Sequence, residues 1–185
     1  SAKPIQASSR PSLPDAAAYG VDLMQRQTLF FDALRQRANT MLAHERDGMP
    51  PVLKFKYELV ADAATFEPAC NYQLLKILEI GDICLDDCLD PDKPPVIIID
   101  PRAGHGPGIG GFKDDSEVGI ALHEGYPVYF VVFTPDPVSG QTLADVLAGL
   151  RQFVELVAER HDGEAPVLYG NCQGGWAAAL LAADC

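Results

Sequence analysis

The stretch "VIIID", Val96–Asp100, is a continuous apolar run of β-branched residues that ends in an acidic residue. Such a run is typical of a strand that is buried on both faces, as in the middle of a parallel sheet. Two later runs have the same character, "PVYFVVF" at 127–133 and "APVLYG" at 165–170. We therefore expect three buried strands in this half of the chain.

Helical patterns separate these runs. A short helix is predicted over Ser116–Glu124, and a long amphipathic helix over Gln141–Asp162. Buried strands that alternate with helices predict an α/β fold with a doubly wound, mostly parallel sheet. Right-handed crossovers would bring the carboxyl ends of the strands to one edge, where catalytic loops are placed in such folds.

The amino-terminal part has a different organisation. Residues 1–14 are rich in Ser, Pro and Ala and are expected to form a flexible arm. A helical pattern fills most of 15–50, and 51–185 is expected to be the remaining domain. In that domain, alternation predicts a half-buried strand over Val52–Val60, and we favour a second strand over a short helix at Asn71–Ile80.

Composition narrows the functional classes. The 185 residues are 48% hydrophobic and carry a formal net charge of -12, which argues against binding nucleic acid through its phosphates. No apolar run approaches the roughly 20 residues that a membrane span needs, and no signal core is visible. The odd number of cysteines, 5, does not suggest a disulfide framework. Reduced thiols predict a cytoplasmic protein.

An acidic loop near the middle of the chain invites a metal hypothesis. Cys84 and Cys88 lie four positions apart, with Asp82, Asp86 and Asp87 beside them. A zinc site, however, needs four ligands that usually come in paired clusters, and the sequence has no second cluster. We therefore expect no metal.

The turn "GNCQGG", Gly170–Gly175, has the pattern of a nucleophile elbow. A strand would deliver Cys172 to the edge of the sheet, the glycines would allow a sharp turn, and a helix would begin at once. The amino end of that helix favours the thiolate, which is the nucleophilic form. The backbone N–H of Gln173 would be one oxyanion donor. The alternative is that Cys172 is an inert small residue in a tight turn.

A second oxyanion donor is expected from the glycine-rich loop "DPRAGHGPGIGGF", Asp100–Phe112. The loop also matches a G-x-G-x-x-G dinucleotide pattern, but Asp136 is only loosely placed for the acidic ribose partner. The histidine of this loop could instead polarise a carbonyl, act as a base or only hold the loop by hydrogen bonds. The candidates are His105 and Gly106 for the oxyanion hole, and Arg102, Gly108, Gly110 and Gly111 for substrate binding.

The residues after Cys172 include no histidine. In the α/β-hydrolase order the acid and the histidine follow the nucleophile. We therefore expect this chain to be the amino-terminal piece of a longer protein, or to receive those residues from another chain. The exposed sheet edges of such a piece would favour self-association or pairing with the carboxyl-terminal remainder.

Three blocks of the sequence resemble a known family. "DPRAGHGPGIGGFKDDSEVGIAL", "GYPVYFVVFTPDPVSGQTLADV" and "GNCQGGWAAALLAA" are similar to the bacterial poly(3-hydroxyalkanoate)-synthase-like proteins, a family of unknown function related in fold to α/β-hydrolases. The resemblance extends over nearly all of the chain after the arm. It implies a partial α/β-hydrolase fold that ends just after the elbow.

In polyester synthases the cysteine of the G-x-C-x-G-G box is acylated by a hydroxyacyl thioester of coenzyme A. The resemblance implies that role for Cys172, with a histidine and an aspartate beyond Cys185. It therefore implies acyl transfer, or ester or thioester cleavage, on a small-molecule or polyester substrate without a cofactor. The alternative is a non-catalytic scaffold whose amino-terminal helix binds a partner or a polyester granule. A simpler interpretation of that helix is that it covers its own domain.

Overall fold

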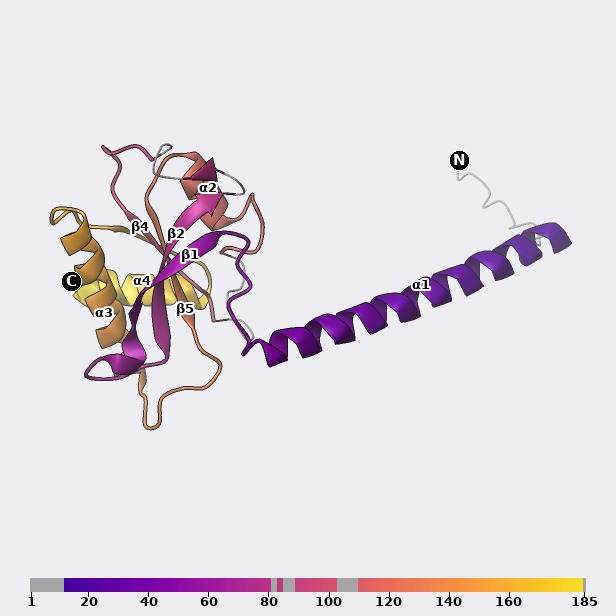
Figure 1. Ribbon diagram of the computed structural model, residues 1–185, viewed down its shortest axis with the longest axis horizontal. Helices are drawn as coiled ribbons and strands as arrows, with labels where there is room; N and C mark the ends of the chain where they lie inside the picture. Colours follow the sequence, from indigo (N-terminus) through magenta and orange to yellow (C-terminus); the bar gives the residue numbers. More distant parts are fainter. Residues whose placement is uncertain (1–11, 81–82, 85–88, 103–109, 185) are drawn as a thin grey trace, which may run out of the picture. The chain divides into compact units, whose positions relative to one another are not determined.

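The computed structural model describes residues 12–80, 83–84, 89–102 and 110–184. The chain divides into two compact units, Ser1–Met49 and Pro50–Cys185, and each is described by itself. The order of helices and strands along the chain can be followed in Figure 1.

The first unit contains one long helix, α1 (Leu13–Arg46). It begins with a capping box, in which Ser12 and Asp15 each bond the backbone N–H of the other. The Ser12 hydroxyl donates to the Asp15 carboxylate as well, and this bond, together with that from the Ser12 N–H, holds the pKa of the Asp15 carboxyl below its ordinary value. The predicted helix is confirmed, although it begins two residues earlier than expected. No helix in the described ranges is long and apolar enough to cross a bilayer.

The second unit is built on a mixed sheet with the strand order β1-β2-β5-β4-β6. Strand β2 pairs antiparallel with both β1 and β5, whereas β4 pairs parallel with both β5 and β6. On this path β2 alone runs against the others, so the sheet is mixed, within the predicted α/β class. The strands are β1 (Lys56–Asp62), β2 (Tyr72–Ile80), β3 (Ile83–Cys84, paired with β2), β4 (Val96–Ile99), β5 (Val128–Phe133) and β6 (Val167–Gly170).

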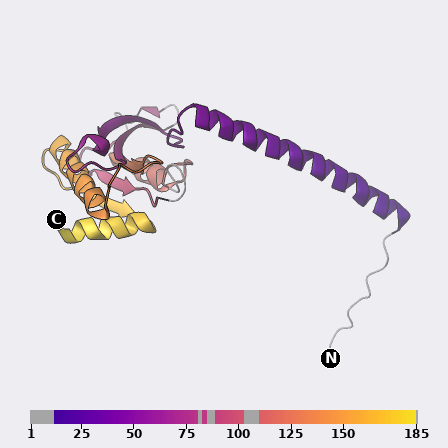
Figure 2. The same cartoon turned by 90° about the horizontal axis from the view of Figure 1, so that it is seen from below.

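Helices cover both faces of this sheet. Helix α2 (Glu117–His123) packs on one face, and α3 (Leu143–Arg160) and α4 (Gln173–Asp184) pack on the other. Strand β4 shows the alternation, since Ile97 and Ile99 belong to the α3 face and Ile98 to the α2 face. In Figure 2 the orange α3 and the yellow α4 can be followed side by side.

Most of the predicted elements are present. The strand favoured over a helix at 71–80 is β2, and the two helices expected between the parallel strands are α2 and α3. Three expectations need correction. The strand predicted over Val52–Val60 is β1, which begins at Lys56 and ends at Asp62. The acidic loop contains the short strand β3, because residues 83–84 pair antiparallel with the end of β2. The strand predicted over 165–170 is not buried.

This last strand, β6, alternates between exposed and half-buried residues. Val167 and Tyr169 are 47% and 45% exposed. The reason is topological, because β6 pairs with β4 alone in the described part of the chain and so forms an edge of the sheet. An apolar sequence shows that a strand can be buried, but not whether a neighbour covers it.

Phe153 tests the packing of α3 on the sheet. It is fully buried and lies edge-on to the ring of Phe66. We expect Phe153→Ala to lower the free energy of unfolding by about 3–5 kcal/mol, because it removes a large buried side chain and leaves a cavity. Leu143→Ala is the control on the same helix, since Leu143 is 56% exposed, and a change within about 0.5 kcal/mol is expected. Urea unfolding measures both, and equal effects would contradict this packing.

Candidate active site

The junction between β6 and α4 carries the candidate nucleophile. Strand β6 ends at Gly170 and α4 begins at Gln173, so Asn171 and Cys172 alone connect them. Cys172 has φ 51, a left-handed conformation that is uncommon for a residue with a side chain. Its thiol is free and exposed. A strained, exposed residue between a strand and a helix is the geometry that a nucleophile elbow requires.

Glycines make this turn possible because the backbone segments approach too closely for a Cβ. A Cβ on Gly170 would collide with the carbonyl group of Gly174, and one on Gly174 would collide with the carbonyl oxygen of Ile99. A Cβ on Gly175 would lie 2.8 Å from the carbonyl oxygen of Gly170. The first turn of α4 is therefore pressed against the ends of both β6 and β4. Gly174, which is buried, is the residue that lets the helix meet the sheet.

The start of α4 also leaves donors at this edge. The N–H of Gly175 bonds the carbonyl of Asn171, and the N–H of Trp176 bonds that of Cys172. The first N–H groups of a helix have no intrahelical acceptor, and Gln173 is the first residue of α4. Its N–H directly follows Cys172, in the position predicted for one oxyanion donor.

The segment after β4 leaves the same edge of the sheet. Asp100 is buried, and its carboxylate accepts the N–H of Arg102 at 3.3 Å. Arg102 itself has φ 55. Its guanidinium carbon lies 5.6 Å from the ring centre of Tyr72 and 5.4 Å from that of Phe133, and one N–H donates to the Tyr72 hydroxyl. The candidate substrate-binding arginine is thus seated over two aromatic rings at the carboxyl edge.

Sequence reasoning missed the two rings beneath Arg102. Tyr72 opens β2 and Phe133 closes β5, and the antiparallel register places them opposite each other. Burial raises the pKa of the Tyr72 hydroxyl, while the nearby Arg102 acts in the opposite direction. Tyr72 and Phe133 are brought together only by the pairing of β2 with β5, and the sequence does not specify that pairing.

A partly buried pair of amide side chains, Asn71 and Gln141, joins two segments at the same edge and was also missed. Asn71 bonds the carbonyl of Thr134 through its side chain, and its backbone N–H bonds Gln141 at 2.8 Å. The Gln141 amide returns a bond to the Asn71 side chain at 2.8 Å. These bonds join the start of β2 to the segment between β5 and α3, so they hold the rim of the site in place.

The remaining candidates in the glycine-rich loop divide into two groups. Gly110 and Gly111 are buried, and a Cβ would collide with the rings or methyls of Phe130 and Leu53, respectively. Close packing on the α2 face therefore explains why these two positions are glycine. The three others, His105, Gly106 and Gly108, lie outside the described residues.

The described histidines of the second unit do not meet Cys172 at the carboxyl edge. His123 is the last residue of α2, and His161 directly follows α3. These helices lead into β5 and β6, so both histidines lie at the opposite edge. His161 contacts the Tyr129 hydroxyl at 3.1 Å, and burial lowers its pKa. His44 belongs to α1. A general base for Cys172 is therefore not supplied by the described residues of the second unit.

No group of three or more His, Cys, Asp or Glu side chains that could hold a metal ion occurs among the described residues. The acidic loop had suggested a metal site. Four of the residues in that hypothesis lie outside the described ranges: Asp82, Asp86, Asp87 and Cys88. The chemistry visible at this edge is that of an exposed thiol, a helix amino end and a seated arginine.

Comparison with known families matches residues 22–185 to the model described as "Protein of unknown function (DUF3141)". The chain belongs to this family. A relative from Rhizobium meliloti, "Uncharacterized protein in ackA 5'region", is 44% identical over 175 residues, which cover 93% of this chain. The match spans only 23% of that relative's length. No solved structure matches the chain.

Gly174 tests the elbow in this member of the family. We expect Gly174→Ala to lower the free energy of unfolding by about 1–3 kcal/mol, because the added methyl group would have to push the helix off the carbonyl of Ile99. Gly20→Ala is the matched control, since a Cβ at this helical glycine would meet nothing within 4 Å. Alanine there should be neutral or raise the helix content of α1.

Chemical unfolding and circular dichroism measure the two variants. If Gly174→Ala is as well tolerated as Gly20→Ala, the first turn of α4 is not pressed against β4 as described.

Proposed function

We propose that this chain carries the nucleophile half of an acyl-transfer enzyme, with Cys172 as the attacking residue. The substrate is an ester or thioester of a small-molecule or polyester acyl group. The domain is proposed to be the amino-terminal part of an α/β-hydrolase-like fold. The base and its orienting acid come from residues outside this chain.

The observation that carries the proposal is the backbone conformation of Cys172. A residue with a side chain is held at φ 51, with its thiol exposed, at a two-residue junction between a parallel strand and a helix. Strained conformations of this kind persist only where the surrounding structure imposes them, and they cluster at functional sites. Cys70 provides the contrast, because it is fully buried and burial raises the pKa of its thiol.

The proposed reaction follows the usual order of covalent acyl transfer. The histidine removes the thiol proton, and the Cys172 sulfur attacks the carbonyl carbon, so that a C–S bond forms and the carbonyl π electrons move to oxygen. The N–H of Gln173 stabilises this oxyanion. When the carbonyl re-forms, the bond to the leaving thiol or alcohol breaks, and the leaving group takes the proton from the histidine. A hydroxyl acceptor or water then attacks the acyl-enzyme in the same way.

The sequence resemblance supports the substrate class. The box of Gly170, Cys172, Gly174 and Gly175 is similar to that of polyhydroxyalkanoate synthases, whose cysteine receives a hydroxyacyl group from coenzyme A. Arg102, seated at the same edge, is proposed to contact a negatively charged part of such a substrate. Coenzyme A would in that case be part of the substrate and not a resident cofactor.

The test uses the protein at its full natural length, incubated with a panel of coenzyme A thioesters and activated esters. We expect an acyl adduct on the peptide that contains Cys172, detected by mass spectrometry. Cys172→Ala should abolish the adduct and lower acyl transfer at least about a thousandfold, because removal of a nucleophile leaves only binding and oxyanion stabilisation.

Cys70→Ala is the matched control. It removes a buried thiol on the α3 face, so it should leave the acyl adduct unchanged wherever the variant remains folded by circular dichroism. An active Cys172→Ala variant, or a Cys172 thiol that no alkylating or acylating reagent modifies, would refute the proposal.

A further inference from the structure

The edge strand β6 has one unpaired side. Val167 donates its N–H to the carbonyl of Pro95 at 2.8 Å, which lies on the β4 side. Because successive backbone groups of a strand point to opposite sides, the N–H and C=O of Leu168 face away from β4. No strand in the described ranges pairs with that side. An unpaired edge of this kind is a template for another strand.

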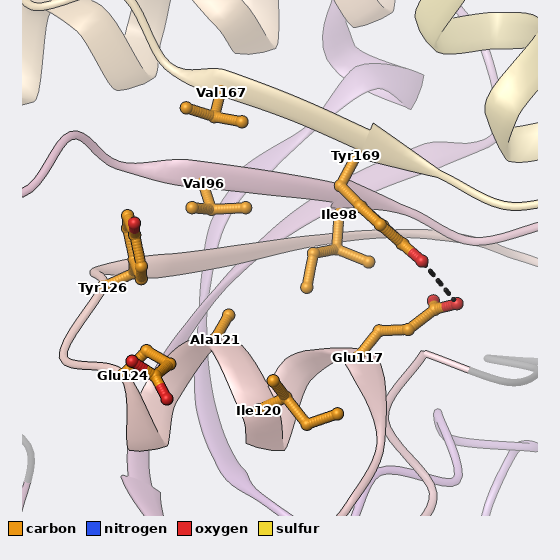
Figure 3. A pocket seen from close by; sticks show the side chains of 9 residues that line it. All are labelled: Val96, Ile98, Glu117, Ile120, Ala121, Glu124, Tyr126, Val167 and Tyr169. Carbon is orange, nitrogen blue, oxygen red and sulfur yellow. Dashed lines mark hydrogen bonds between the residues drawn. The ribbon is translucent and has the colours of Figure 1, made fainter.

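An apolar groove adjoins this edge on the α2 face. Figure 3 shows side chains from β4, β6 and α2 converging on it. The groove has a volume of about 320 Å³, and the hydroxyl of Tyr169 closes one end by donating to the Glu117 carboxylate at 3.2 Å. The apolar walls come from Val96, Ile98, Ile120, Ala121, Val167 and Tyr169.

The floor of the groove is buried, since Val96 and Ile98 are 8% and 1% exposed, but its rim is not. Ile120 of α2 is 57% exposed, and Val167 is 47% exposed. Elsewhere on the same face Phe130 and Val118 are completely covered. A surface that combines contiguous apolar side chains with an unpaired backbone edge is suited to a further layer of secondary structure rather than to water.

The path of the chain indicates where that layer comes from. The crossover from β5 to β6 runs through α3, moves past β4, and stays on the α3 face. Helix α4 leaves β6 on the same face. Crossovers between parallel strands are right-handed almost without exception. A parallel strand after α4 must therefore continue in the same direction, and the position next to β6 in that direction is its free edge.

We propose that the segment following residue 185 in the full-length protein docks on this surface. Its first strand pairs parallel with the free side of β6, and its apolar side chains fill the groove between β6 and α2. The length of the Rhizobium meliloti relative is consistent with this, because the 175 matched residues account for only 23% of it. The proposal rests on the sheet alone and does not require Cys172 to be catalytic.

This occupant is favoured over a second copy of the chain or an acyl ligand. A ligand would fill the groove but leave the backbone of Leu168 unpaired. A second copy would have to find the edge by association, whereas the continuation reaches it directly from α4. The three occupants differ in whether, and at which protein concentration, they protect the backbone N–H of Leu168 from hydrogen exchange.

The test is hydrogen exchange of the full-length protein, read at single residues by mass spectrometry with electron-transfer fragmentation. We expect the N–H of Leu168 to be protected to within about tenfold of its neighbour Val167, because both would be bonded within a sheet. Val167 is the internal control, since its bond to Pro95 exists in either case.

Two results would overturn the proposal. One is exchange at Leu168 more than a hundredfold faster than at Val167, which would show an open edge or a groove filled by a ligand alone. The other is protection of Leu168 that is lost on dilution, which would show a second copy. The experiment is therefore run at two protein concentrations.

The thermal stability of two variants tests the proposed docking independently. Val167→Asp should lower the Tm of the full-length protein by several degrees, because the carboxylate would be buried beneath the docked segment. Val52→Asp is the matched control, since Val52 is 56% exposed and lies outside the groove. Equal Tm values for the two variants would contradict the proposed docking.

Discussion

The structure of this site depends on the contact between the first turn of α4 and the carbonyl end of β4. Gly174 meets Ile99 there, and Gly170 meets Gly174, with no space for a Cβ at either glycine. This contact forces the chain to turn within two residues, which places Cys172 in a left-handed conformation with its thiol exposed. The same contact directs α4 along the α3 face, so it determines both the candidate chemistry and the direction in which the chain leaves the sheet.

Several features of the carboxyl edge follow from the order of the strands. Because β4 lies between β5 and β6, the segments that follow all three strands gather at one edge. Arg102 is seated over Tyr72 and Phe133, and the Asn71–Gln141 pair holds the rim. The edge thus combines an exposed thiol, helix N–H groups and a fixed cation, whereas the described histidines of this unit lie at the opposite end. These are the groups on which the proposed acyl transfer depends.

Much of the fold could be predicted from local pattern. The apolar run of β4, the amphipathic stripe of α3 and the glycine spacing at the elbow all identified their elements. The burial of β6 was predicted wrongly, because "VLYG" shows an apolar strand but not the absence of a partner on one side. Tyr72 and Phe133 could not be found, since they meet only through the register of β2 with β5. The close packing of Gly110 and Gly111 against Phe130 and Leu53 could not be predicted either, because it depends on the tertiary arrangement of the α2 face.

The most direct measurement is an experimental structure of the full-length protein. We expect a histidine, contributed from outside the described residues, with an imidazole nitrogen about 3–4 Å from the sulfur of Cys172 and a carboxylate bonded to its other nitrogen. We also expect Cys172 to keep its positive φ just before α4. A structure in which the thiol faces only apolar side chains, with no imidazole within reach, would contradict a nucleophilic role for Cys172.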